Sequence, residues 1–92
     1  MSSRRSRLSI YIEILDSIKR QEELEGKAKI TRILFDANLP YARVKEKLDE
    51  LMKLGLIEIV GEKYYRLTER GRRALMELRK VLRIVEAFGL RV

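Results

Sequence analysis

Cationic side chains supply most of the chemistry that this sequence offers. Lysine and arginine account for 21 of the 92 residues against 14 aspartates and glutamates, which gives a net charge of +7. A basic domain with a pI above about 9 is typical of proteins whose partner is a polyanion. Many small proteins carry such a charge only to stay in solution. Composition alone therefore leaves nucleic acid and plain solubility as two open interpretations.

The residue types used in most enzyme and metal sites are missing. The chain has no Cys and no His, which excludes disulfides, thiolate or imidazole metal sites and imidazole acid–base catalysis. Two adjacent acid pairs occur, Glu22-Glu23 and Asp49-Glu50, but consecutive residues of a helix do not face each other. We therefore expect no enzyme activity, no cofactor and no metal, and the sequence indicates no small-molecule ligand.

Two consecutive helices are predicted to position some of the cations. Apolar residues from Ile30 to Ala37 recur at i, i+3, i+4 and i+7, which predicts an amphipathic helix over 32–37 with Thr31 as its N-cap. Asn38 tolerates the left-handed conformation that ends a helix. Pro40 suits the first turn of a second helix that ends near Leu54. The side chains expected to face inward on this second helix are Tyr41, Val44, Leu48, Leu51 and Met52.

A β-hairpin and a last helix follow. The runs 57–60 and 63–67 are β-rich and alternate in polarity. The two residues between them, Gly61 and Glu62, predict a two-residue hairpin turn. Thr68 is the expected N-cap of a helix that reaches about Phe88.

The N-terminal part is predicted to be a basic arm and one further helix. Residues 1–8 read as a disordered arm, and Ser9 is the expected cap of a helix that Gly26 ends. Glu22, Glu23 and Glu25 are expected to be solvated, and a very short strand fits 27–30. The expected inward face of the helix consists of Tyr11, Ile14, Leu15, Ile18 and Leu24.

This order of elements predicts a single domain over 9–92, mainly α with a small β-hairpin (α+β). It is the outline of a winged helix-turn-helix, with three helices, a wing and a longer C-terminal helix over 68–88 used for dimerisation. In such a unit the second helix enters the major groove of DNA with its N-terminal residues near the base edges. Element order thus favours double-stranded DNA as the partner.

Arg43 is the best candidate for a base contact, because its guanidinium can donate two hydrogen bonds to one guanine. Lys45 and Lys47 suit phosphates, and Lys63 and Arg66 lie on the predicted wing. Acidic residues on the same second helix (46, 49 and 50) favour the alternative that it is a solvated or protein-binding surface. The predicted DNA-binding residues are Arg32, Tyr41, Ala42, Arg43, Lys45, Lys47, Lys63 and Arg66.

The last helix carries an apolar stripe that is longer than a domain of this size can cover. A stripe left in water would form an apolar patch, and such patches mark interfaces. We expect two of these helices to pair antiparallel as a short coiled coil, with packing inside one chain as the alternative. Arg72, Arg79 and Arg83 lie on the opposite face and are solvated by default, with phosphate contact from a wrapped duplex as the alternative. The predicted dimer interface consists of Leu78, Val81, Leu82, Val85 and Phe88.

The runs 30–41, 47–51 with 55–57, and 65–71 resemble an archaeal winged helix-turn-helix family of small dimeric chromatin-type proteins and transcriptional regulators. The resemblance covers about residues 12–78 and includes I-T-R-I and L-T-E-R-G. It implies DNA binding through the helix that carries Arg43 and dimerisation through the last helix. Two departures are Pro40, where the family often has a polar cap, and a shorter last helix, which favours a regulator over a bulk packaging protein.

These features together predict a homodimeric DNA-binding transcriptional regulator in the cytoplasm, associated with the nucleoid and not with a membrane. The alternatives are an architectural chromatin protein and a winged helix used as a protein–protein interaction module. One Asn, one Gln, no Cys and 38% charged residues form a composition typical of hyperthermophiles.

Overall fold

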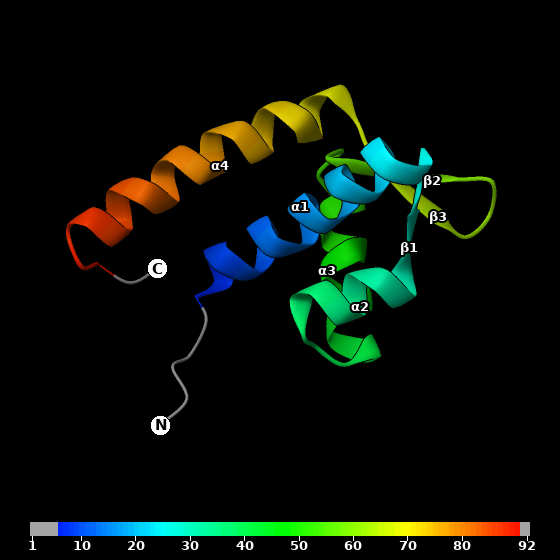
Figure 1. Ribbon diagram of the computed structural model, residues 1–92, viewed down its shortest axis with the longest axis horizontal. Helices are drawn as coiled ribbons and strands as arrows, with labels where there is room; N and C mark the ends of the chain where they lie inside the picture. The colour runs from blue at the N-terminus through cyan, green and yellow to red at the C-terminus, as the bar shows by residue number, and fades with distance from the viewer. Residues whose placement is uncertain (1–5, 91–92) are drawn as a thin grey trace.

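The structure is a computed structural model that describes residues 6–90 (Figure 1). Its four helices and small antiparallel sheet confirm the predicted α+β winged helix fold. The elements in chain order are α1 (Arg7–Glu25), β1 (Ala28–Lys29), α2 (Ile30–Ala37), α3 (Tyr41–Lys53), β2 (Ile57–Val60), β3 (Tyr64–Leu67) and α4 (Glu69–Ala87).

The sheet has the strand order β1-β3-β2, and both pairings are antiparallel. Val60 pairs with Tyr64, so the hairpin loop consists of three residues, 61–63, and the predicted two-residue turn is wrong. Gly61 takes up the reversal with a φ of 66°, which a residue without Cβ adopts at little cost. Lys63 therefore lies in the loop, at the tip of the wing, where a contact with DNA was expected.

Helix α1 is the central element of the core. It lies between α4 on one side and α2 and α3 on the other (Figure 1). Ile14, Leu15 and Ile18 are fully buried, as predicted, and Ile10 and Ile12 are buried as well. Because neighbours cover α1 on several sides, it buries more than one stripe. The exception is Leu24, which is 84% exposed and not inward as expected, since it lies in the last turn of α1.

Two helices begin at residues other than those predicted. Ser6, not Ser9, caps α1: its hydroxyl accepts a hydrogen bond from the Ser9 amide, and the Ser9 hydroxyl donates to the Ser6 carbonyl, both at 3.0 Å. The helix therefore takes in residues 7 and 8 of the expected arm, and residues 1–5 of that arm lie outside the described part. Helix α2 begins at Ile30 without a side-chain cap, because the preceding Lys29 is still paired with Tyr64 in the sheet.

The start of α4 is fixed to the turn that follows α3. The Thr68 amide donates to the Leu56 carbonyl (3.0 Å), and its hydroxyl donates to the Gly55 carbonyl (2.6 Å). The same hydroxyl accepts from the Gly71 amide (3.0 Å), so Thr68 is the N-cap, as predicted. These bonds set the direction in which α4 leaves the wing.

Two ion pairs join the first half of α4 to α1. The Glu22 carboxylate is only 8% exposed and accepts from the Leu67 amide (2.7 Å) and from Arg72 (2.6 Å). Arg79 pairs with Asp16 in the same way. The expectation that Glu22, Arg72 and Arg79 are only solvated is therefore wrong, because each has a partner on the neighbouring helix. None of the helices described within residues 6–90 is long and apolar enough to cross a membrane.

Candidate nucleic-acid interface

The first turn of α3 is exposed to solvent on one side of the helix and is held in place by buried residues on the other side. Tyr41, Ala42 and Arg43 are all exposed, whereas Val44 and Leu48 on the opposite side of the helix are fully buried. Tyr41 was expected to face inward but is 55% exposed, because Val44 and Leu48 fill the space under α3. The turn is therefore anchored from below and accessible from outside.

Arg43 has no ion pair and no hydrogen bond from its side chain within residues 6–90. A guanidinium that is exposed and unpaired keeps all five N–H donors available for a partner. Arg43 thus keeps both the position and the donors that a base contact requires.

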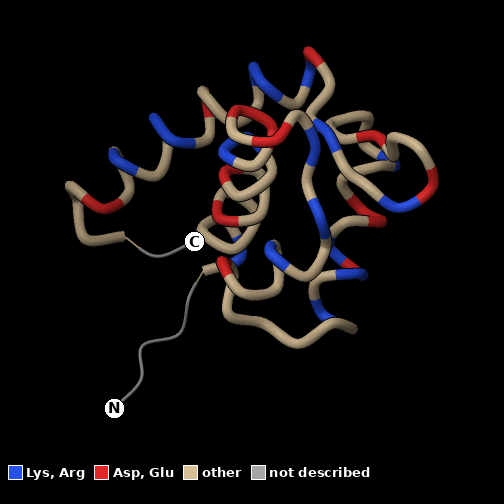
Figure 2. Tube along the Cα trace, turned by 45° about the vertical axis from the view of Figure 1, so that its right-hand side comes forward, with Lys and Arg blue, Asp and Glu red and all other residues tan. Residues whose placement is uncertain are grey.

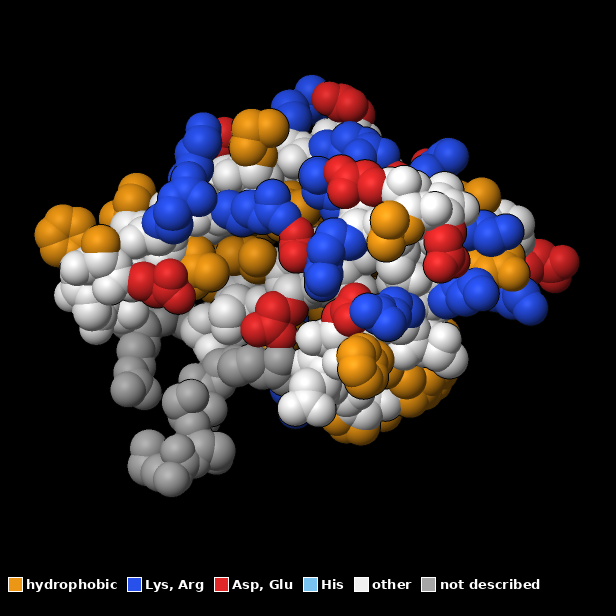
Figure 3. Space-filling view, in the orientation of Figure 1, with side chains coloured by type: hydrophobic (Ala, Val, Ile, Leu, Met, Phe, Trp, Pro, Cys, Tyr) orange, Lys and Arg blue, Asp and Glu red, His pale blue; other side chains and the backbone are white. Residues whose placement is uncertain are grey.

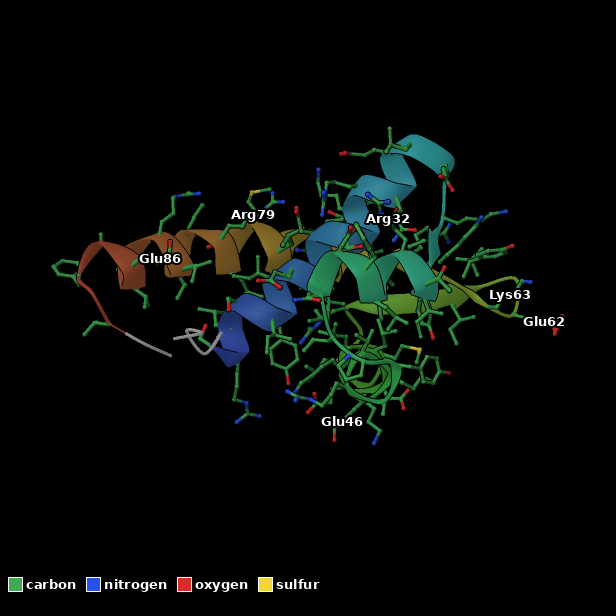
Figure 4. The ribbon with its side chains drawn as sticks, turned by 60° about the horizontal axis from the view of Figure 1, so that its bottom comes forward. Arg32, Glu46, Glu62, Lys63, Arg79 and Glu86 are labelled. Atoms are coloured by element: carbon green, nitrogen blue, oxygen red, sulfur yellow. The ribbon has the colours of Figure 1, made fainter. Side chains whose placement is uncertain are left out.

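The next cation on α3 is partly neutralised. The Lys45 ammonium lies 2.9 Å from the Asp49 carboxylate, and this hydrogen bond and charge raise the pKa of Lys45. Figure 4 shows Glu46 on the outer side of the same helix. The exposed face of α3 therefore changes from cationic at its start to mixed charge one turn later.

Lys47 does not lie on the exposed face, contrary to the prediction that it meets phosphate. Its side chain is 11% exposed, and its ammonium lies 5.1 Å from the Tyr11 ring and 3.5 Å from Glu50. It points inward because position 47 shares the α1-facing side of α3 with residue 51. Lys47 therefore contacts α1 from α3, and its ammonium is not available to a DNA backbone.

The Tyr11–Glu50 contact gives a pH-dependent prediction. The Tyr11 hydroxyl donates to Glu50 at 2.7 Å, and this bond, assisted by the Lys47 charge, lowers the pKa of Glu50. Because the pKa is depressed in the folded state, the contribution is present at neutral pH and lost as the pH falls through that pKa. Tyr11→Phe is expected to raise the Glu50 pKa in a carboxyl NMR titration. Glu23, whose pKa is lowered by Lys19, is the control carboxylate and is expected not to move.

Of the two cations predicted on the wing, one is exposed without a carboxylate partner within residues 6–90 and the other is in an ion pair. Arg66 is held by Glu58 on the neighbouring strand, with N–O distances of 3.2 and 2.9 Å, so its charge is shared. Lys63 lies at the exposed tip beside Glu62 (Figure 4). Its ammonium is 5.8 Å from the Tyr64 ring, and it has no carboxylate partner among the described residues.

Two further lysines next to the wing were missed by the sequence analysis. The Lys27 ammonium lies 4.3 Å from the Tyr64 ring, and Lys29 and Lys63 line one shallow hollow together with Tyr64. Neither Lys27 nor Lys29 has an ion pair within residues 6–90. Their signal in the sequence was a lysine on each side of Ala28, but only the pairing of β1 with β3 brings them to the wing.

Arg32 on α2 (Figure 4) also has an internal partner. Its guanidinium lies 3.2 Å from Asp36 and 5.1 Å from the Phe35 ring. Figure 2 shows the same mixture of cations and acids along most of the chain, so pairing decides which cations are free. Of the six predicted cations at the interface, the structure leaves Arg43 and Lys63 exposed and unpaired.

The predicted dimer stripe of α4 divides into two faces. Leu78 and Leu82 pack against the core of their own domain, and Val85 is half-buried. Val81 and Phe88 are exposed, by 45% and 75%, as an interface of a separate chain would need. Ile84, at 58%, belongs with the exposed pair and was missed. Figure 3 shows hydrophobic side chains on the free end of α4.

Comparison with known proteins gives consistent results. The sequence profile of a family described as winged helix-turn-helix matches residues 4–86. An uncharacterized protein of Methanocaldococcus jannaschii is 31% identical over 84 residues, which are 91% of this chain and 80% of that protein. The crystal structure of Sso10a-2, a DNA-binding protein from Sulfolobus solfataricus, is similar with a TM-score of 0.75 and 25% identity. This likeness covers 91% of the present chain and 85% of Sso10a-2.

Proposed function

The chain belongs to the winged helix-turn-helix family, and from this premise we propose that it binds double-stranded DNA. The observation that carries the proposal is the first turn of α3, where Arg43 is exposed and unpaired on a helix anchored by its opposite face. The likeness to Sso10a-2, a DNA-binding protein, supports it, as does the net charge of +7.

In the proposed complex the start of α3 enters the major groove. Arg43 donates two hydrogen bonds to a guanine, while Tyr41 and Ala42 line the same turn. Lys63 at the wing tip, with Lys27 and Lys29 beside it, binds phosphates. Lys45, Arg32 and Arg66 have internal carboxylate partners and contribute less, since a DNA contact must compete with an existing ion pair.

We further propose that the chain acts as a homodimer in transcription regulation at the nucleoid. The exposed residues of α4, Val81, Ile84 and Phe88, supply an apolar surface for a second copy. A dimer of this kind presents two α3 helices to two half-sites of one operator. Footprinting across a genome distinguishes this role from a general architectural role: a regulator protects a few sharp sites, whereas an architectural protein protects DNA broadly.

Salt dependence tests the DNA-binding proposal. Three phosphate contacts per protomer, from Lys27, Lys29 and Lys63, give a slope of about −2.7 in a plot of log affinity against log salt. Affinity is then expected to fall roughly 40-fold per protomer between 50 and 200 mM salt, as measured by fluorescence anisotropy with a labelled duplex. Replacing the three lysines by alanine is expected to remove most of this slope. An affinity that does not change with salt would contradict the proposal.

Glu46 favours a second candidate, a protein-interaction module. It is exposed on α3 and directly follows Lys45, whose charge is already balanced by Asp49, so this part of the helix would repel a phosphate backbone. A chain that shifts no duplex even at low salt, yet co-purifies with a protein partner through α3, would select this candidate.

A further inference from the structure

A hollow of about 620 Å³ lies beside the first half of α4, between that helix, the start of α1 and the end of α3. Its wall is mainly apolar: Leu8 and Tyr11 contribute from α1, and Leu51 and Leu54 contribute from the end of α3. The Tyr11 hydroxyl is already bonded to Glu50. The volume lies in the range of roughly 300–1,000 Å³ that is usual for sites that bind small molecules.

The α4 side of the hollow carries two cations at one end and an acid at the other. Arg70, Arg73, Ala74 and Glu77 line it, and their spacing of i, i+3, i+4 and i+7 keeps them on one face of the helix. Arg70 and Glu77 are separated by about 10 Å along the helix axis. An apolar hollow with one positive end favours an elongated occupant that carries a negative charge at one end only.

Arg70 is the cation that is available to such an occupant. Its side chain is exposed and has no ion pair and no hydrogen bond within residues 6–90, whereas Arg73 lies 3.8 Å from Glu69. The Arg70 Cδ lies 3.7 Å from the point that a Cβ at Gly55 would occupy, so its stem covers the turn after α3. The guanidinium keeps its donors, and two of them can bind one carboxylate in parallel.

We infer that the hollow binds a monoanionic amphiphile, a molecule with one carboxylate and an elongated apolar tail. The carboxylate pairs with Arg70, and the tail lies along α4 toward Leu78. Both residues line the hollow, and they are about 12 Å apart along the helix, which is about the length of a ten-carbon chain. Glu77 repels an anion at the far end and thereby fixes the orientation. The site lies outside the proposed DNA-binding surface, and its occupation does not depend on DNA.

Chain length tests the apolar part of the site. Hexanoate, octanoate and decanoate are titrated into the full chain without DNA and followed by isothermal titration calorimetry. Each buried methylene group is expected to raise the affinity by up to about 4-fold, so decanoate is expected to bind about 10-fold more tightly than octanoate. Equal affinities for the three carboxylates would overturn the inference.

Decanedioate tests the orientation of the ligand. Its second carboxylate would lie beside Glu77 when the first is bound to Arg70. Because two like charges placed side by side repel each other, decanedioate is expected to bind at least about 10-fold more weakly than decanoate. An equal affinity would show that the far end of the hollow does not select against an anion, and would overturn the proposed orientation.

Arg70→Gln tests the charged end, because it keeps most of the stem and removes the charge. It is expected to weaken decanoate binding by about 10- to 100-fold, as for a lost hydrogen-bonded charge pair. Arg83→Gln is the matched control: Arg83 is an exposed cation of α4 without an ion pair in the described part of the chain. It lies about 20 Å further along the helix, so screening by salt is expected to keep its effect below about 3-fold. Decanoate that bound both variants equally would overturn the inference.

Ala74→Leu tests the hollow without a change of charge. Ala74 is a half-buried residue of the wall, and a larger side chain there takes up space that the tail needs. The variant is expected to bind decanoate at least about 10-fold more weakly, which corresponds to about two methylene groups left in water. Its circular dichroism spectrum shows whether it folds, and a folded variant with unchanged affinity would place the ligand elsewhere.

Sedimentation equilibrium separates this ligand from a second copy of the chain as the occupant. The mass of the protein is expected to be the same with and without saturating decanoate. If decanoate bound only while a dimer dissociated, the hollow would belong to a contact between two copies, and the inference would be overturned. A chain that binds no decanoate at millimolar concentration would overturn it as well. Neither result touches the DNA-binding proposal, which is judged by its salt dependence.

Discussion

Gly71→Ala is expected to destabilise the fold by about 3 kcal/mol or more, a cost at the upper end of what overpacking of a protein interior causes. A Cβ at this position would lie 1.9 Å from the Leu56 carbonyl oxygen and 2.9 Å from the carbonyl carbon. The obstacle is backbone, so no side-chain rotation relieves it. The same carbonyl accepts the hydrogen bond from the Thr68 amide, and moving it would also disturb the helix cap.

Helix propensity alone predicts the opposite sign. Glycine inside a helix is less stable than alanine by roughly 0.5–1 kcal/mol. If nothing crowded position 71, Gly71→Ala would therefore stabilise the fold. Gly26→Ala is the control, because Gly26 has a φ of 83° and a Cβ added there would meet nothing within 4 Å. The free energy of unfolding of this variant is expected to fall by only about 1–2 kcal/mol, which is the cost of placing a residue with a Cβ in the left-handed conformation. Urea unfolding of both variants measures the difference, and a stabilised Gly71→Ala would refute the close approach.

The arrangement of the helices and the hairpin could be predicted because local patterns determine it. The i, i+3, i+4 spacing of α2, the left-handed Asn38 with a φ of 54° and the Thr68 cap all depend on residues close in sequence. The start of α2 could not be predicted in the same way. The helix begins directly after Lys29 because β1 pairs with β3, a contact between residues 35 positions apart in the chain.

The site was less predictable than the fold, because the availability of a cation depends on its neighbours in space. Arg66 and Arg43 have the same chemistry in the sequence, but Glu58 holds only Arg66. Lys47 follows Lys45 by two positions and is buried against Tyr11. The stripe of α4 shows the same limit: periodicity predicts an apolar helix, but only the position of α1 decides that Leu82 packs inward and Ile84 faces out.

Arg43→Ala is expected to weaken binding to a preferred duplex by about 10- to 100-fold, which corresponds to about 1–3 kcal/mol for a bidentate contact to guanine. The preferred sequence is first obtained by selection from random duplexes with the wild-type chain. On random duplexes the loss is expected to be only a few-fold, because one cation among many then supplies only a non-specific contact. Repeating the selection with Arg43→Ala is expected to relax the preference at one base pair and to leave the other positions unchanged.

Lys53→Ala is the matched control, because Lys53 is an exposed cation on the same helix without an ion pair within residues 6–90. It lies at the opposite end of α3 from Arg43, so the proposed docking keeps it away from the base edges. Its removal is expected to lower affinity for preferred and random duplexes alike, or not at all. If Arg43→Ala and Lys53→Ala reduced both affinities by the same factor, Arg43 would act as a general positive charge, and base recognition by the first turn of α3 would be refuted.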